Sequence, residues 1–342
     1  MATVSLETRS SYGELVKGVG VQFLDVFNQS NLSYSMAIDD VVATVGNKMT
    51  MLAKQAKTDA ATVHYEGKSG IDYLGITEEG EAFNSDSRLL LYKTSVSPKK
   101  MTNSVSVSYE AMEDREYDNE LSEFGDLTIA GKETMDKTFF DIFNYAFTAQ
   151  SSLPTFIVGY GDGKPLCSTS HPRKDGGTAQ RNTFASATTQ LTLTDTNLET
   201  ARIDLARQLD DRGKQTRVGK GKLILLVPFE LEKTAVLITN GVKRSGTANN
   251  DINIYDGNVT VVASNWIGYS GNGGSLPTTA WFLIDPRFAQ LRFILREGLR
   301  THQYEDPNTL SQTFYIMCRF AVCWSDWRGV YGSLGDVSAY SS

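Results

Sequence analysis

Cysteine and histidine are scarce in this chain of 342 residues, and their scarcity excludes whole classes of protein. The three cysteines are too few and too unevenly spaced to form a disulfide framework. With only three histidines, a metal centre or a catalytic triad has few side chains to draw on. No apolar run approaches the roughly 18 residues of a membrane span, and the polar start of the chain lacks the apolar centre of a secretory signal. We therefore expect a soluble protein that is made in the cytosol and does not enter a membrane.

Positive charge is also in deficit, since 33 lysines and arginines face 40 aspartates and glutamates, a net charge of −7. Such a chain does not coat nucleic acid by bulk electrostatics. The deficit is confined to one half: residues 1–150 hold 13 bases and 23 acids, whereas residues 151–342 hold 20 bases and 17 acids. Hydrophobic residues make up 40% of the chain, which is typical of a soluble protein with a sizeable core.

Apolar residues recur at helical spacing in several segments. Residues 15–27 predict a short amphipathic helix, and residues 119–150 predict the longest helix of the chain, with Gly125 and Gly131 as points where it bends or breaks. Two further helices are predicted over residues 195–213 and 230–239, the first capped by Thr194 or Asp195 and closed by Gly213.

Strand patterns lie between and after these helices. Val105, Val107 and Tyr109 alternate with serines, residues 88–96 form a second strand-like run, and Pro98 to Lys100 lie between the two. An extended two-stranded excursion of this kind is marginal alone in water, so it must fold back onto the core or dock on another subunit. Further strands are predicted at residues 222–227, 259–263, 281–284, 293–295 and 313–324. The irregular mixture of helices and strands predicts an α+β fold.

The chemistry of an active site is missing from the sequence. Residues 159–164 resemble a phosphate-binding loop, but Val158 and Pro165 stand where the motif needs glycine and a hydroxyl residue, so we expect a plain turn. Ser170 precedes His171 without the nucleophile-elbow motif, and His302 with Glu305 lacks a third metal ligand. We expect the histidines on the surface or in loops. We expect no enzyme activity, no catalytic residue, no metal and no cofactor.

Cys318 and Cys323 are five residues apart in a predicted strand, which places their side chains on opposite faces. They are interpreted as small buried hydrophobic residues rather than a redox or metal pair.

Two clusters of charge remain. Residues 110–126 hold eight acids against the single base Arg115, which fits a solvated helix start because carboxylates favour a helix N-terminus. Residues 212–222 form a basic turn, for which a nucleic-acid contact and an ion-pair surface between subunits are both open interpretations.

The order of these segments and several short motifs resemble the tailed-phage major capsid proteins of the Hong Kong 97-type fold, and most of all the Mu-like major head subunits. The resemblance covers roughly residues 65–332, and its strength lies in the order of the motifs. They are Leu166-Cys-Ser-Thr-Ser-His-Pro172, Arg181-Asn-Thr-Phe184, Leu223 to Pro228, Asn249 to Tyr255, Trp281 to Pro286, Asp326 to Tyr331, and the strand from Val105 that ends in Met-Glu-Asp114.

The resemblance implies a division into four parts. Residues 1–59 would be the N-terminal arm and helix, and residues 60–112 an extended loop that lies across an adjacent subunit. Residues 113–190 and 289–342 would form the peripheral domain, with the spine helix at 119–150. Residues 191–288 would form the axial domain.

The function implied is that of a major capsid protein, which assembles with itself into hexamers and pentamers of an icosahedral shell in the virion. The shell would be built in the host cytoplasm and enclose DNA without sequence-specific binding, with portal, scaffolding or decoration proteins as further partners. Complementary charges on identical copies predict inter-subunit contacts, at Arg88, Lys93, Lys99, Lys100, Glu113, Asp114, Arg212, Lys214, Arg217 and Lys220. The alternatives are an encapsulin-like compartment shell, a cytosolic enzyme using Asp114, His171 or His302, and a nucleic-acid-binding module.

Overall fold

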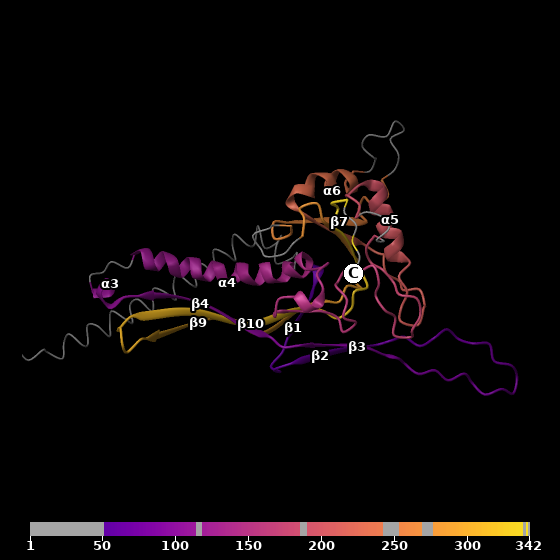
Figure 1. The fold of residues 1–342 in the computed structure, drawn as a ribbon, viewed down its shortest axis with the longest axis horizontal. Coiled ribbons are helices and arrows are strands. Elements are labelled where there is room, and N and C mark those ends of the chain that lie inside the picture. The colour runs from indigo at the N-terminus through magenta and orange to yellow at the C-terminus, as the bar shows by residue number, and fades with distance from the viewer. Residues whose placement is uncertain are drawn as a thin grey trace, which may run out of the picture. The chain divides into compact units, whose positions relative to one another are not determined.

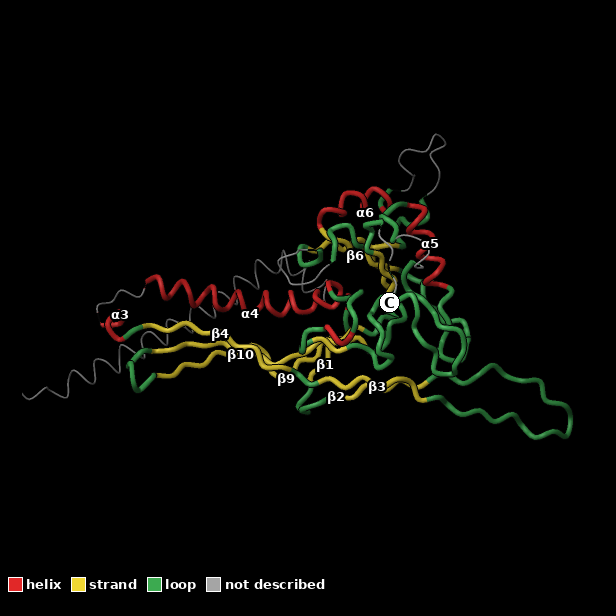
Figure 2. The backbone as a smooth tube through the Cα atoms, in the orientation of Figure 1, coloured by secondary structure: helices red, strands yellow, loops and turns green. Residues whose placement is uncertain are grey.

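The computed structural model describes residues 51–113, 118–184, 190–241, 253–268, 276–337 and 340. Helices and strands intermix along the chain, which confirms the predicted α+β class (Figures 1 and 2). The chain divides into two compact units, each made of separate stretches. The first unit includes Pro98–Lys137 and Leu295–Phe320, and the second includes Thr50–Ser97, Thr138–Ile294 and Ala321–Ser342. The predicted helix at residues 15–27 lies outside the described residues.

The first unit is built on a long antiparallel pairing. Strand β4 (Lys99–Val107) pairs with β10 (Gln312–Trp324), in a register that runs from Val107 opposite Gln312 to Lys99 opposite Phe320. On the other side of β10 lies β9 (Leu291–Glu305). Alternate residues of β10, including Phe314, Ile316 and Cys318, are buried, as expected of a sheet with one face covered.

The helix that covers this sheet is α4 (Asp118–Asn144), the long helix predicted over residues 119–150. It runs without a break through Gly125 and Gly131, so neither glycine interrupts it. The prediction was wrong by six residues at the C-terminal end. There the backbone carbonyls of Ala146 and Phe147 accept hydrogen bonds from the Cys167 N–H, at 2.8 Å, and the Tyr340 hydroxyl, at 2.9 Å, instead of from the next helical turn. A short 3₁₀ turn, η1 (Gln150–Ser152), follows.

The second unit contains a four-stranded sheet in the order β11 (Val330–Ser333), β8 (Trp281–Ile284), β6 (Leu223–Pro228) and β7 (Val259–Ser264). Strand β6 is buried along its whole length, as its continuous apolar sequence predicts. It pairs in parallel with β7 and antiparallel with β8.

Helices α5 (Asp195–Ala206) and α6 (Glu232–Thr239) belong to the second unit, with a 3₁₀ turn, η2 (Phe229–Leu231), before α6. The side-chain oxygen of Thr194 accepts a hydrogen bond from the Asn197 N–H, which confirms the predicted cap of α5. The predicted closure at Gly213 was wrong, because α5 ends at Ala206 and Gly213 lies in a later turn with a φ of 79°. There Leu209 pairs with Gln215, which removes these residues from the helix.

The second unit also carries a hairpin made of β2 (Val63–Lys68) and β3 (Leu90–Val96), joined by a long loop (Figure 1). The two strands predicted near residue 100 are therefore not partners of each other: β3 pairs with β2, whereas β4 pairs with β10. Lys99 and Lys100 belong to β4 rather than to a connection.

The alternation at Tyr109 was also misleading, because Tyr109 begins α3 (Tyr109–Glu113). Ser108 caps this helix by accepting a hydrogen bond from the Ala111 N–H at 3.2 Å. Two short strands complete the second unit: β1 (Lys54–Lys57) and β5 (Ile157–Val158), which pairs in parallel with Val322 and Cys323 at the end of β10.

Candidate interaction surface

The loop between β2 and β3, residues 69–89, is the feature of the described chain that most clearly demands a partner. Its apolar side chains are almost fully exposed: Leu74 by 100%, Ile76 by 97% and Phe83 by 95%. Single exposed apolar residues are ordinary, but several of them on one protruding segment mark an interaction site. A turn at Glu78 to Glu81 forms the tip, where the Glu81 N–H donates to the Glu78 carbonyl at 3.2 Å. The loop is therefore both apolar and acidic.

The base of this loop is tied to the second unit by Arg212. Its guanidinium pairs with the carboxylate of Asp86 at 2.7 Å, and its Nε donates to the Ser69 hydroxyl at 3.1 Å. The same guanidinium donates to the Ser87 carbonyl. The pKa of Asp86 lies below its ordinary value, first because the Asp72 N–H donates to this carboxylate and then because Arg212 pairs with it. Arg212 thus holds both ends of the loop together.

Lys214 makes a second attachment two residues further along the chain. Its ammonium group donates to the Ile71 carbonyl and lies 4.2 Å from the centre of the Tyr73 ring. In the same unit, the ammonium group of Lys174 lies 4.4 Å from the centre of the Tyr92 ring on β3. The loop therefore leaves the unit from a base fixed by three cations, and its apolar residues lie beyond that base.

The ten side chains predicted as inter-subunit contacts fall into three groups. Arg212 and Lys214 are brought together, and both bind the loop of their own chain. Six others are exposed basic residues without an ion pair or hydrogen bond from their side chains to any described residue: Arg88, Lys93, Lys99, Lys100, Arg217 and Lys220. The side chain of Glu113 and the whole of Asp114 lie outside the described residues. Contact of these residues with a neighbouring subunit stays a prediction.

Sequence reasoning missed the partners of the two anchoring cations. Asp86 and Tyr73 lie 126 and 141 residues before them, so no local pattern connects these side chains. The only signal was one of charge, since the loop is rich in acids and residues 212–222 are rich in bases.

One histidine is buried, although it lies in a loop outside the helices and strands, within the expected surface or loop positions. His171 is 1% exposed, its Nδ1 lies 2.8 Å from Oδ2 of Asp162, and its ring stacks on Trp327 at 4.3 Å between centres. His64 and His302 are exposed, as expected. The turn at residues 159–163 has a structural role, because it places the carboxylate of Asp162 within hydrogen-bond distance of the buried His171 ring.

All three cysteines are buried and unpaired, which confirms the interpretation of Cys318 and Cys323 as small buried hydrophobic residues. Burial raises the pKa of the Cys323 thiol to about 12, which keeps it protonated and unreactive. Within the described part of the chain, no three potential ligands from histidine, cysteine, aspartate and glutamate gather where they could hold a metal ion. A search of the same residues finds no helix with the length and apolar character needed to cross a membrane.

Comparison with known proteins identifies the family to which this sequence is similar. A family model described as phage capsid protein matches residues 92–333, which is well over half of the chain. A search of curated proteins finds no match.

Among solved structures, the capsid of an empty GTA particle is similar with a TM-score of 0.49 at 10% identity, covering 86% of this chain and 89% of that one. The mature capsid of bacteriophage PhiM1 gives 0.48 at 12% identity, with 82% and 84% covered. The head of Helicobacter pylori bacteriophage KHP40 gives 0.48 at 12% identity, with 82% and 87% covered. Because these TM-scores lie below 0.5, the family match alone carries the assignment.

Proposed function

The chain belongs to the phage capsid protein family, and from this premise we propose that it is the major subunit of an icosahedral phage head. A subunit of this kind acts through repeated contacts between identical copies, so its functional site is a surface rather than a catalytic centre. The expected absence of enzyme activity agrees with this role. The net charge of −7 suits a wall that encloses DNA without sequence-specific binding.

The observation that carries the proposal is the exposure of Leu74, Ile76 and Phe83 on the loop at residues 69–89. Burying one such side chain is worth about 1.5–3 kcal/mol, so leaving three of them in water forgoes a large stabilisation. The loop would recover this free energy by lying across an adjacent copy. Its base, held by Arg212 and Lys214, would set the direction in which it leaves the subunit.

We propose that the subunit has the parts of a Hong Kong 97-type capsid protein. The Hong Kong 97-type arrangement assigns residues 1–59 to the arm, 60–112 to the extended loop and 191–288 to the axial domain. The peripheral domain would combine residues 113–190 and 289–342, with α4 as its spine helix. The continuity of α4 and the hairpin of β2 and β3 support this division. The resemblance to Mu-like head subunits belongs to the same proposal.

The proposed partners are further copies of the chain, arranged as hexamers and pentamers. Portal, scaffolding and decoration proteins are proposed as additional contacts, and assembly is proposed to take place in the host cytoplasm before DNA enters.

Expression of the full chain, followed by light scattering and negative-stain microscopy, tests the proposal. Closed shells of uniform diameter that enclose DNA during phage growth are the expected result. A protein that stays monomeric at high concentration, with the loop protected from protease, would overturn it. Shells that enclose protein cargo instead of DNA would replace the phage head with the compartment alternative.

A further inference from the structure

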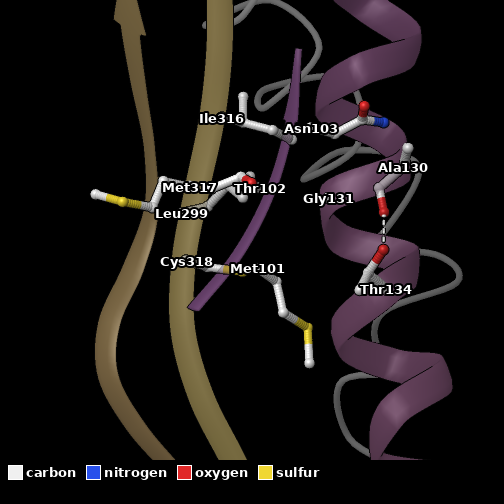
Figure 3. Close-up of a pocket in the computed structure, with 10 residues that line it drawn as sticks. All are labelled: Met101, Thr102, Asn103, Ala130, Gly131, Thr134, Leu299, Ile316, Met317 and Cys318. Carbon is white, nitrogen blue, oxygen red and sulfur yellow. Dashed lines mark hydrogen bonds between the residues drawn. The ribbon is translucent and has the colours of Figure 1, made fainter. Parts of the chain in front are cut away.

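A small pocket opens in the first unit between α4 and the sheet of β4 and β10 (Figure 3). Its volume is about 80 Å³, and none of the described residues that line it is charged. Met101, Leu299 and Ile316 form much of its wall, and Thr102 and Asn103 of β4 also line it and are exposed. The pocket is therefore apolar inside and accessible from the surface.

The residues of α4 that line the pocket are small: Ala130, Gly131 and Thr134. A Cβ atom added at Gly131 would lie 2.7 Å from Cδ1 of Ile316 and 2.9 Å from Cδ1 of Leu299, so the close approach of helix and sheet at this position requires glycine. Ala130 adds a methyl group, and the Thr134 hydroxyl donates to the Ala130 carbonyl at 2.7 Å. This hydrogen bond satisfies the one side-chain hydroxyl that α4 contributes to the wall (Figure 3).

The size of the pocket limits the side chain that can fill it. A cavity of roughly 150 Å³ holds a benzene molecule, so one of about half that volume suits an aliphatic side chain better than an aromatic ring. The loop at residues 69–89 offers such a group in Ile76, which is 97% exposed. Phe83, at 95% exposed, carries a ring that the pocket is too small to enclose.

Charge around the pocket matches charge around Ile76. Alternate residues of an extended chain point to the same face, so Lys99 lies on the face of β4 that carries Met101. In the loop, Glu78 follows Ile76 by the same two residues. Lys99 is exposed and has no ion partner among the described residues. The loop thus carries an apolar side chain, Ile76, next to the acid Glu78, and the apolar pocket lies next to the base Lys99, so the two surfaces are complementary in charge.

We propose that this pocket receives Ile76 from the loop of a second copy, with Glu78 facing Lys99. The inference rests on the proposed function and deepens it, because it names the surface of the neighbour on which the loop docks. The buried contact is apolar, and the ion pair at its edge sets the register between copies.

Disulfide trapping between two differently tagged proteins tests the contact directly. One protein carries Ile76→Cys and the other carries Asn103→Cys, at the pocket lining. Both also carry Cys318→Ala, because the thiol of Cys318 lines the same pocket and could otherwise pair with the new cysteine. Oxidation of the assembled mixture is expected to give mixed dimers several-fold more efficiently than a control in which Ser104→Cys replaces Asn103→Cys. Ser104 is exposed on the same strand, and its side chain points to the opposite face of the sheet.

Assembly of substituted proteins provides the second measurement. Ile76→Asp and the pocket-filling Ala130→Leu are each expected to abolish shells or raise the concentration needed for assembly several-fold, with unchanged circular dichroism of the free subunit. Assembly of both variants at the wild-type concentration would overturn the inference. So would equal trapping at Asn103 and Ser104, or a disulfide that forms within one chain when Ile76→Cys and Asn103→Cys are combined. If the wild-type chain forms shells but these results are negative, only the docking site fails; if it forms no shells, the proposed function fails.

Discussion

Asp162 and His171 form a buried pair, with 2.8 Å between Oδ2 and Nδ1 and at most 1% of either side chain exposed. Asn182 fixes the other side of the imidazole. Its amide nitrogen donates to the carbonyls of Leu166 and Val330, and its Oδ1 accepts from the Ser168 N–H, so this oxygen faces Nε2 of His171 at 3.1 Å. Each ring nitrogen of His171 therefore has a hydrogen-bond partner, Asp162 at Nδ1 and Asn182 at Nε2. Through the hydrogen bond of Asn182 to the Val330 carbonyl, the pair is connected to β11 of the same unit, 148 residues later in the chain.

Replacing His171 by alanine should destabilise the protein strongly. The substitution leaves the carboxylate of Asp162 buried without its partner, and breaking a buried pair in this way costs about 3–5 kcal/mol. The free energy of unfolding in urea measures the effect. His64→Ala is the matched control, because His64 is exposed and Ser95 is the one hydrogen-bond partner of its ring among the described residues. It should change stability by less than about 1 kcal/mol. A similar small loss for His171→Ala would show that the buried pair contributes little.

Replacing Arg212 by alanine should free the base of the loop without unfolding the second unit. The side chain holds Asp86, Ser69 and the Ser87 carbonyl, and these contacts vanish together. Hydrogen exchange at residues 69–89 is expected to speed up several-fold. Arg217→Ala is the control, since Arg217 is exposed and has no partner among the described residues. Equal exchange in both variants would contradict the anchoring role.

Acid should release the same loop. The pKa of Asp86 is lowered in the folded chain, so its stabilising contact is fully present above the ordinary aspartate pKa and is lost as pH falls through the lowered value. Faster cleavage of the loop by an acid-tolerant protease at low pH would show this release. In Arg212→Ala the pH dependence of loop cleavage should largely disappear. If it were unchanged, groups other than the Asp86–Arg212 pair would be responsible for the release of the loop.

Gly131 should tolerate no branched side chain. Valine at this position would push against Ile316 and Leu299 from within 3 Å, and overpacking of this kind costs about 1–3 kcal/mol. Thermal unfolding of Gly131→Val measures the loss. Gly298→Val serves as the control in the same unit, because a Cβ atom added at Gly298 meets nothing within 4 Å. Gly298 also lies on strand β9, and valine is a favoured residue in strands. Equal melting temperatures would show that the helix shifts away from the sheet at little cost.

Asp136 on α4 should make stability depend on pH between about 4 and 6. Burial, and then repulsion from Glu133, raise the pKa of this carboxyl to about 6. A folded pKa above the unfolded value means that the folded chain holds the proton more tightly, so stability falls as pH rises through this window. Asp136→Asn is expected to be more stable than wild type at pH 7 by about 1–3 kcal/mol, with the difference vanishing near pH 4. Urea unfolding at both pH values measures this, and a constant difference would contradict the shift.

Much of the fold could be predicted from local pattern. The helical spacing in α4, the continuous apolar run of β6 and the Thr194 cap of α5 each reflect how a single element buries one face or satisfies its own end. The phage capsid family could also be predicted, because the order of several short motifs in the sequence resembles that family.

Other features could not be read locally. The end of α4 depends on donors from Cys167 and Tyr340, and the strand partner of β4 depends on β10, some two hundred residues away. The sequence shows that cysteine and histidine are scarce, but it does not show which side chains surround them in the folded protein. Only the tertiary structure buried His171 beside Asp162 and tied Arg212 to the loop. Period and composition determine which faces need covering, whereas the partner that covers each face is decided when distant segments compete for the same hydrogen bonds and apolar contacts.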